Sequence, residues 1–440
     1  MYIMLGWKVL EKGEYKTELP RLSDQEEKLI LDVEELFKKE MRSKTIKSKE
    51  ECKELIEKII YDYAKQNRMH LDLDQLDYLS EVAAIDVYGN RFLDYLIKDP
   101  EIEEISVIGV NKPVYVYIRN KGWKTTNLCF TNDEIIKETI NKIGKELGRR
   151  ITLQKPMLNA TLDDGSRLHA TLSPVSEGEI TIRKFREKPI SPKQLYLNKT
   201  IDKRILALLS LIVQGDNNII IAGNTASGKT TMLNALFSFV PMNERVVITE
   251  ETPEINIPHK HQLRLVTQEE MEIDITNLIY NSLRMRPDRT IVGEVRNRKE
   301  VHALFDVLTS GQARGSFATF HAQNAEEACT RIKNFGIDSL SSIDFILVLR
   351  RMLNYRNNKN SEIRKVIELY SPKIGYIYNY QNGKLKLSIK DNLIKMIGEK
   401  LGLSKSETKK ELERRERLIE RADEEFSKFY NRIQKELYGL

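Results

Sequence analysis

The chain has 440 residues, in which 71 Lys and Arg stand against 65 Asp and Glu, so the formal net charge at pH 7 is +6. This length exceeds one ordinary hydrophobic core and predicts two or three domains. The small charge excess, without a long basic block, argues against a nucleic-acid binder. Three widely spaced cysteines, Cys52, Cys129 and Cys329, argue against a disulfide framework and against a structural zinc site.

The apolar runs of the chain are short. Leu206 to Val213 is among the longest, far below the roughly 20 residues that span a bilayer. The first seven residues lack the basic and apolar segments of a signal peptide. We therefore predict a cytoplasmic protein without a transmembrane segment, associated with the cytoplasmic membrane only through a partner.

The first 85 residues are predicted to form a helical extension. Ser23 with Glu26, and Ser48 with Glu51, have capping-box spacing before runs with one apolar face. From about Gly89 short alternating strands indicate a smaller α+β domain, for which we take residues 86–190.

Residues 186–202 hold two prolines and read as an interdomain linker. Residues 191–390 then alternate buried strands with helices, the pattern of a parallel sheet covered on both faces. A hairpin is predicted around residues 381–383. Residues 391–440 are predicted to be a charged helical tail. Within it, residues 404–440 predict a helix with one apolar seam, either folded back on its own domain or paired with a partner in a coiled coil.

The segment 219–231 combines a buried strand, a glycine-rich loop and the start of a helix. Gly223 and Gly228 let backbone N–H groups converge on a phosphate without a Cβ in the way. Lys229 can reach the β- and γ-phosphates, and the Thr230 hydroxyl can hold Mg²⁺. A glycine-rich turn that binds nothing is the alternative. The predicted ATP-binding residues are Gly223, Asn224, Thr225, Ala226, Ser227, Gly228, Lys229, Thr230 and Thr231.

Acidic residues follow two further predicted strands. Glu250, Glu251 and Glu254 come directly after the strand 246–249, and ligands bind at this carboxyl edge of open parallel sheets. Each of the three alone is also compatible with a solvated loop acid. Glu294 ends the next strand, where it can hold Mg²⁺ through water or act on the attacking water; a salt bridge to a neighbouring arginine is its structural alternative.

A third strand ends at His321. This side chain can contact the γ-phosphate and report hydrolysis to neighbouring elements, although a lone strand-end histidine is more often structural.

Together these segments resemble the type II/type IV secretion and pilus ATPases, a family of RecA-like motors. Residues 223–230 match the family's Walker A loop, 249–254 its Asp box, 285–296 its Walker B region and 315–322 its His box. The fold class that the resemblance implies is α/β, with a RecA-like P-loop core of mostly parallel sheet with helices on both faces, preceded by the α+β domain and the helical extension.

The resemblance extends into the preceding domain. Residues 163–167 and 181–184 are similar to the two segments whose arginines reach the γ-phosphate in the family, which makes Arg167 and Arg183 arginine-finger candidates. Such fingers on a hinged domain would make hydrolysis wait for domain closure.

Three features depart from the family pattern. Glu251 stands where the family usually has Asp, so which Asp-box acid faces the water is open, and Glu250 is the predicted general base. Gln312 replaces a second histidine of many relatives. The four-cysteine zinc insert of the bacterial type II secretion and pilus-extension branch is absent, so the match is closer to the conjugation-type, tight-adherence and archaeal branches.

The resemblance implies a homo-oligomer, a hexamer, that hydrolyses ATP with Mg²⁺. Such a motor would drive a pilus, archaellum or secretion assembly through a polytopic membrane platform protein, without direct nucleic-acid binding. The alternatives are a nucleic-acid translocase or recombinase on the same sheet, for which Arg350, Arg351, Arg356 and Lys359 are the local hint, and a nucleotide-binding regulator without turnover.

Overall fold

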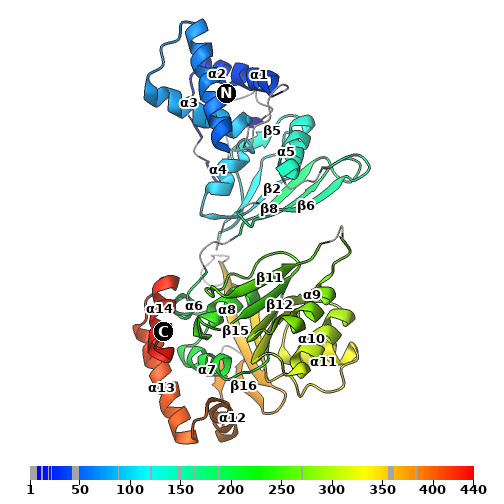
Figure 1. Cartoon of the computed structure of the whole chain (residues 1–440), viewed down its shortest axis with the longest axis vertical. Coiled ribbons are helices and arrows are strands. Elements are labelled where there is room, and N and C mark those ends of the chain that lie inside the picture. The colour runs from blue at the N-terminus through cyan, green and yellow to red at the C-terminus, as the bar shows by residue number, and fades with distance from the viewer. Residues whose placement is uncertain are drawn as a thin grey trace. The chain divides into compact units, whose positions relative to one another are not determined.

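The computed structural model describes residues 7–10, 13–17, 19–20, 22–41, 49–87, 89–118, 121–146, 150–162, 164–185, 189–268, 271–354, 361–381 and 384–440. The chain divides into two compact units, Met1–Phe185 and Arg186–Leu440 (Figure 1). The finer division at residues 85, 190 and 390 stays a prediction.

The first unit combines N-terminal helices with an antiparallel sheet. Its elements are β1 (Trp7–Val9), α1 (Asp24–Glu40), α2 (Lys49–Gln66), α3 (Leu73–Val87), α4 (Leu93–Lys98), β2 (Ile102–Val107), β3 (Tyr115–Ile118), β4 (Gly122–Thr125), β5 (Leu128–Phe130), α5 (Asp133–Glu146), β6 (Met157–Thr161), β7 (Arg167–Thr171) and β8 (Glu179–Arg183). The predicted capping box of Ser23 and Glu26 opens α1, whereas Ser48 lies outside the described residues.

The six-stranded sheet has the order β4-β3-β2-β8-β7-β6, and every neighbouring pair is antiparallel. Its strands alternate buried and more exposed residues, so one face is apolar. That face shares a hydrophobic core with the helices, to which Leu29, Ile56, Leu93, Ile105 and Ile140 contribute. The opposite face carries polar side chains.

The second unit is built on a nine-stranded sheet. Its elements are α6 (Pro192–Leu197), α7 (Lys203–Gln214), β9 (Ile219–Gly223), α8 (Lys229–Leu236), η1 (Phe237–Phe239), β10 (Val246–Glu250), β11 (Gln262–Val266), α9 (Ile275–Ser282), η3 (Leu283–Met285), β12 (Arg289–Val295), α10 (Arg298–Ser310), β13 (Gly315–Phe320), α11 (Ala325–Asn334), β14 (Phe345–Asn354), β15 (Ser361–Ser371), β16 (Gly375–Gln381), β17 (Lys384–Leu387), α12 (Asp391–Leu401), α13 (Lys405–Arg421) and α14 (Phe426–Tyr438).

The strand order is β11-β10-β12-β13-β9-β14-β15-β16-β17. The strands from β11 to β14 in this order run parallel, and β15, β16 and β17 continue the sheet antiparallel. Parallel strands bring their carboxyl ends to one edge. The glycine-rich loop after β9 therefore shares an edge with the ends of β10, β12 and β13.

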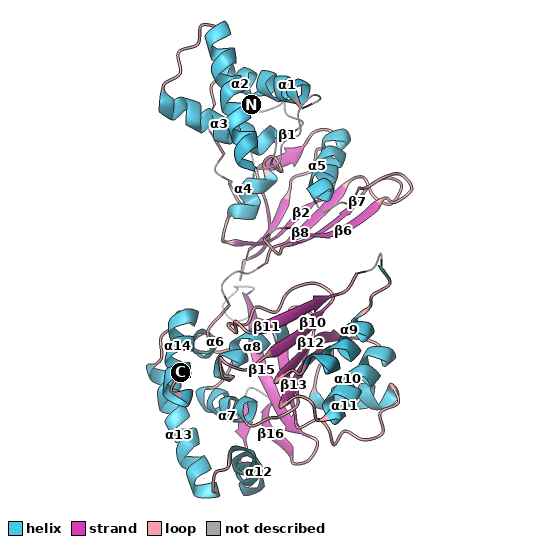
Figure 2. Ribbon diagram, viewed as in Figure 1, coloured by secondary structure: helices cyan, strands magenta, loops and turns pink. Residues whose placement is uncertain are grey.

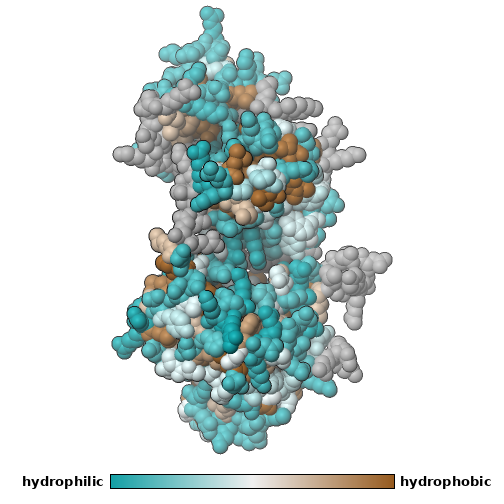
Figure 3. All heavy atoms as spheres, turned by 90° about the vertical axis from the view of Figure 1, so that its right-hand side faces the viewer, coloured by the Kyte–Doolittle hydropathy of each residue, from teal (hydrophilic) through white to brown (hydrophobic). Residues whose placement is uncertain are grey.

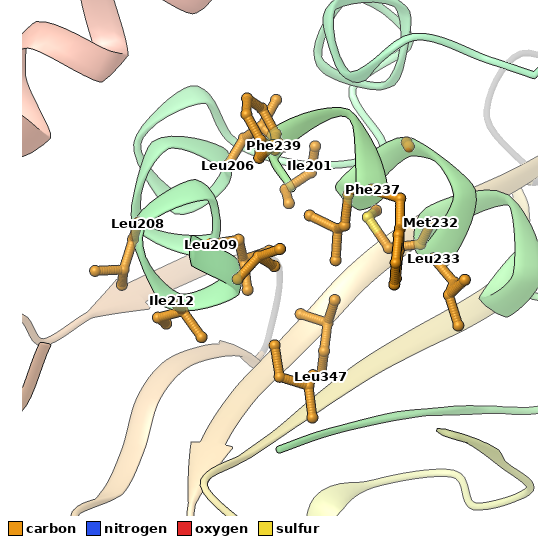
Figure 4. Close-up of a cluster of buried hydrophobic side chains, with 14 of the residues drawn as sticks. Ile201, Leu206, Leu208, Leu209, Ile212, Met232, Leu233, Phe237, Phe239 and Leu347 are labelled. Atoms are coloured by element: carbon orange, nitrogen blue, oxygen red, sulfur yellow. The ribbon is translucent and has the colours of Figure 1, made fainter. Parts of the chain in front are cut away.

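Helices cover both faces of this sheet, as the α/β prediction required (Figure 2). On one face α7 and α8 pack over β14, where Leu209, Met232, Phe237 and Leu347 belong to one buried cluster (Figure 4). On the other face α9, α10 and α11 enclose a second cluster that includes Ile279. The burial of both faces explains the continuous apolar runs of the parallel strands.

Two predictions for the second unit need correction. The stretch 186–202 is not all linker, because it contains α6, which opens with a capping box of Ser191 and Gln194 and with Pro192 in its first turn. Residues 404–440 form two helices rather than one, because Ala422 adopts an extended conformation between α13 and α14.

The tail folds back on its own unit, the first of the two predicted arrangements. Leu412, Ile419, Phe429 and Ile433 are buried in the same hydrophobic cluster as the apolar residues of α7. The amide of Gln434 donates to the carbonyls of Ser238 and Val240 and accepts from the Met242 N–H. These contacts make the tail part of the domain core.

β16 and β17 pair antiparallel on either side of residues 382–383, and those turn residues lie outside the described part of the chain.

Hydrophilic residues predominate on the face drawn in Figure 3. None of the helices in the described ranges has the length and apolar character needed to cross a membrane.

Candidate nucleotide-binding site

The glycine-rich loop connects β9 to α8, as predicted. Ala226 and Gly228 have left-handed backbone angles, with φ of 59° and 94°, and such loops form a concavity of N–H groups that binds anions. At Gly223 a Cβ atom would lie 2.5 Å from the Leu349 carbonyl oxygen and 2.4 Å from Ser227 Oγ. Only glycine fits there, so the start of the loop is fixed by packing.

Lys229 is the first residue of α8 and is 8% exposed. Its ammonium group turns back over the loop, with Nζ 3.3 Å from the Gly223 carbonyl oxygen and 3.5 Å from that of Asn224. A buried ammonium at the mouth of such a loop can bind an anionic ligand, since a phosphate supplies charged acceptor oxygens.

Thr230 lies at the same helix end, and its Oγ1 donates a hydrogen bond to Glu254 Oε2 at 3.2 Å. The structure thus brings the loop hydroxyl together with one of the three acids of the segment 250–254. Hydroxyl and carboxylate oxygens are the donor atoms that Mg²⁺ prefers. Within the described ranges no three His, Cys, Asp or Glu side chains gather as a ready-made metal site.

Glu250 ends β10 and is 2% exposed. Its Oε1 accepts hydrogen bonds from the backbone N–H groups of Glu254 and Ile255, both at 2.8 Å, and Oε2 lies 3.3 Å from Arg264 Nε. Burial raises the pKa of Glu250 to about 7, although the two N–H donors and Arg264 act in the opposite direction. The carboxylate therefore orders the loop that carries Glu251 and Glu254.

Glu294 lies at an irregularity of β12. Val292 pairs with Ala318 and Val295 with Phe320, so β12 has one extra residue in this interval and forms a β-bulge. A Cβ on Gly293 would come within 3.0 Å of Glu250 Cγ. The bulge and the glycine thus let two acids from neighbouring strands share one edge of the sheet.

His321 contacts Glu294 directly, with Nε2 2.6 Å from Oε1. Burial and the Lys229 charge lower the pKa of His321, against the opposing effect of Glu294. The imidazole is therefore neutral at pH 7, and because a carboxylate only accepts, the proton lies on Nε2. The contact is a hydrogen bond from a neutral ring rather than an ion pair.

Arg296 was not singled out from the sequence, yet it joins two of the predicted acids. Its Nε donates to Glu294 Oε2 at 2.8 Å, and Nη1 contacts Glu251 Oε2. Burial raises the pKa of Glu294, but Arg296, His321 and Lys229 together outweigh it and lower that pKa. The salt bridge considered as an alternative for Glu294 is present, and the carboxylate contacts His321 at the same time.

A small pocket of about 190 Å³ lies beside the loop and is lined by Asn224, Gln323, Leu349, Arg350 and Arg351. Arg350 Nη2 donates to the Gln323 carbonyl at 2.9 Å. Arg350 and Arg351, two of the four basic residues on which the nucleic-acid alternative depends, thus lie at the edge of the glycine-rich loop. The other two, Arg356 and Lys359, lie outside the described residues.

Arg167 and Arg183 belong to the first unit. Their Cα atoms are cross-strand partners of β7 and β8, and Arg183 is also opposite Glu104 of β2. Like charges placed directly opposite are unfavourable unless an anion or acid compensates. The two candidate fingers are therefore adjacent on the polar face of one sheet. Gln312 is exposed before β13, at the sheet edge opposite to His321.

The loop, the parallel strand order and the acids at one sheet edge define a P-loop protein of the RecA-like class. A family model described as "Type II/IV secretion system protein" matches residues 90–411. This match covers most of the chain, which therefore belongs to that family.

Several known proteins are similar in sequence to parts of this chain. An uncharacterized protein of Methanocaldococcus jannaschii is 37% identical over 257 residues, 56% of this chain and 35% of its own length. A second from the same organism is 31% identical, over 69% of this chain and 56% of its own. The chain thus spans about a third to a half of these two relatives. The type IV secretion system protein VirB11 of Bartonella quintana is 26% identical over 56% of this chain and 79% of its own length.

One solved structure is that of the pilus retraction motor PilT with bound ADP. It is 15% identical, with a TM-score of 0.48 over 79% of this chain and 92% of its own.

Proposed function

We propose that the chain is a Mg²⁺-dependent ATPase whose nucleotide lies on the loop 223–231. The observation that carries the proposal is the pair formed by Glu294 and His321, 2.6 Å apart, at the same sheet edge as the buried Lys229. An ionised carboxylate with a neutral histidine can orient and deprotonate a water beside a γ-phosphate. Lys229 would neutralise charge on the phosphates.

Mg²⁺ would be held by the Thr230 hydroxyl, with Glu254 and Glu294 acting through water. The support is the 3.2 Å hydrogen bond between Thr230 and Glu254, which places an acid within reach of an ion at the hydroxyl. The ion would supply positive charge against the phosphate oxygens. Glu250 is the general base predicted from the sequence, and Glu294 is the second candidate for that role. The burial of Glu250 suggests that it also holds the Asp-box loop in place.

We further propose that Arg167 and Arg183 serve as arginine fingers from the first unit. Their adjacency on one polar face suits a single phosphate group, which two guanidinium groups can bind together. Closure of the first unit would then follow the nucleotide state and, in a hexameric ring, move the neighbouring subunit.

The biological role that we propose is a cytoplasmic motor, attached to the membrane through a polytopic platform protein, for pilus, archaellum or secretion assembly. It rests on family membership and on relatives such as VirB11. A pull-down of membrane proteins by the Lys229→Ala variant would identify the partner, and stimulation by DNA instead would favour the translocase alternative.

The activity is tested by phosphate release with and without Mg²⁺. The wild-type chain is expected to hydrolyse ATP only with Mg²⁺, and Lys229→Ala to lose turnover. The matched control is Lys203→Ala, which removes an equal charge from the half-exposed start of α7. Normal turnover by Lys229→Ala would refute the proposed site.

A further inference from the structure

The strand pair β14 and β15 lies against the glycine-rich loop. β14 is the parallel neighbour of β9, and Leu349 pairs with Gly223, the first loop residue. β15 pairs antiparallel with β14 beyond it, with Arg364 opposite Arg351. Residues more than a hundred positions after the loop therefore reach it.

Arg364 makes a direct bond to the loop. Its Nε donates to the Ala226 carbonyl oxygen at 2.9 Å, and its Cδ lies 3.7 Å from the Cβ position of Gly228. The arginine thus contacts both residues that have left-handed backbone angles. A charge-assisted hydrogen bond is stronger than a neutral one, and Ala226, which is not glycine, needs such support to remain in a conformation that is unfavourable for it.

A second bond fixes the loop from the same side. The Arg351 backbone N–H donates to Asn224 Oδ1 at 3.1 Å. The loop is therefore held at Asn224 and at Ala226 by residues that are cross-strand partners of one another. A carbonyl held outward by Arg364 leaves the neighbouring N–H groups to face a bound phosphate.

We propose that Arg364 is a positioning residue that holds the glycine-rich loop in its phosphate-binding conformation before the nucleotide arrives. This inference rests on the proposed nucleotide site and adds to it a residue outside the motifs. Without the bond, the nucleotide itself must order the loop, and part of the binding free energy is used for that ordering. ATP and ADP would be affected alike, so KM rises while kcat is largely kept.

The test measures the ADP affinity of the full chain by isothermal titration calorimetry. Arg364→Ala is expected to weaken the ADP Kd by about ten-fold, the size of one charge-assisted hydrogen bond. Arg364→Lys should remain weakened, because lysine has no donor at the Nε position. The matched control is Lys365→Ala, which removes an equal charge from the next residue of β15; that side chain lies over the Tyr380 ring and should leave the Kd unchanged.

Two further measurements separate positioning from a merely structural role. The melting temperature without nucleotide should be similar in wild type and Arg364→Ala, while the rise on adding ADP should shrink. An equal ADP Kd in wild type and Arg364→Ala, or full recovery with Arg364→Lys, would overturn the inference alone. A wild-type chain that binds no ADP would overturn the proposed function and this inference with it.

Discussion

Glu250 and Glu294 end neighbouring strands of one sheet, but their surroundings shift their pKa values in opposite directions. Burial raises that of Glu250 to about 7. The pKa of Glu294 is lowered, because Arg296, His321 and Lys229 outweigh its partial burial. Acids with separated pKa values in one site are suited to different roles. Glu294 is ionised throughout the physiological range, whereas Glu250 is only partly ionised near pH 7.

Glu294→Gln is predicted to reduce kcat by about 10² to 10⁴, the contribution expected of a carboxylate that acts on the attacking water. ATP affinity should change little, because the glutamine keeps the size of the side chain and can still accept from His321. Phosphate release and nucleotide titration on the same sample measure both. Normal turnover in Glu294→Gln would contradict a role for this carboxylate in hydrolysis.

The pH dependence of kcat shows whether Glu250 or Glu294 is the general base. If Glu250 is the base, kcat should rise with pH through about 7, because the carboxyl is protonated below that value. If Glu294 is the base, its lowered pKa leaves kcat flat over that interval. Measuring kcat from pH 6 to pH 8.5 for wild type and Glu250→Gln decides between them.

Glu250→Gln is also predicted to change stability by an amount that depends on pH. The carboxyl has a pKa of about 7 in the folded chain, against an ordinary glutamate pKa of 4.5. Between these two values the folded state binds more protons than the unfolded state, so wild-type stability falls as pH rises. The glutamine does not titrate. The free energy of unfolding of Glu250→Gln minus that of wild type should therefore be about 2 kcal/mol larger at pH 8 than at pH 5. Denaturant unfolding at both values tests this, and a constant difference would contradict it.

The tail helices α13 and α14 are core elements of the second unit, although their sequences are dense in charge. Arg415 is 3% exposed, and its guanidinium bonds Ser210 and Gln214 of α7 as well as Glu411. Phe429 is fully buried against Phe239. These contacts occupy the apolar seam within the chain's own unit.

Phe429→Ala is predicted to destabilise the chain by about 3 to 5 kcal/mol, because it removes a fully buried ring and leaves a cavity. Lys428→Ala, one residue earlier and exposed, is the control and should change stability by less than about 0.5 kcal/mol. Chemical denaturation of both variants measures the difference. Equal stability would mean that the tail does not pack as described.

The two units carry complementary parts of the proposed chemistry. The acids and the loop lie in the second unit, and the adjacent arginines, Arg167 and Arg183, lie in the first. Hydrolysis would therefore depend on both units, whereas nucleotide binding would depend mainly on the second.

Arg183→Ala is predicted to lower kcat by about 10³ or more, the range measured for arginine fingers, with little change in ADP affinity. Lys155→Ala removes an exposed charge from the same unit and is the control. Phosphate release and ADP titration measure both effects. An unchanged kcat would remove Arg183 from the proposed mechanism.

The motor proposal also predicts that activity depends on assembly. If the active form is a ring, specific activity should rise with protein concentration, because fingers and closure act across subunits. Phosphate release over a hundred-fold dilution series, with sedimentation on the same samples, measures this. A constant specific activity from a monomer would contradict the ring.

The sequence alone determined the features that neighbouring residues encode. The four apolar residues before Gly223 predicted a buried strand, the residues after them predicted a glycine-rich loop leading into a helix, and the alternation of buried strands with helices predicted a parallel α/β core. The structure has each of these elements. Such signals are local, because strand burial, turn conformation and helix capping each depend on a few consecutive side chains.

Only the tertiary structure decided which distant residues meet. Arg296 bridges Glu251 and Glu294, Arg364 reaches Ala226, and the buried environment of Glu250 raises its pKa. The tail breaks at Ala422, since two short helices cover the apolar surface of their own domain. No pattern of neighbouring residues predicts these features. Each depends on strand order, a bulge or burial, which arise only when segments far apart in the chain pack together.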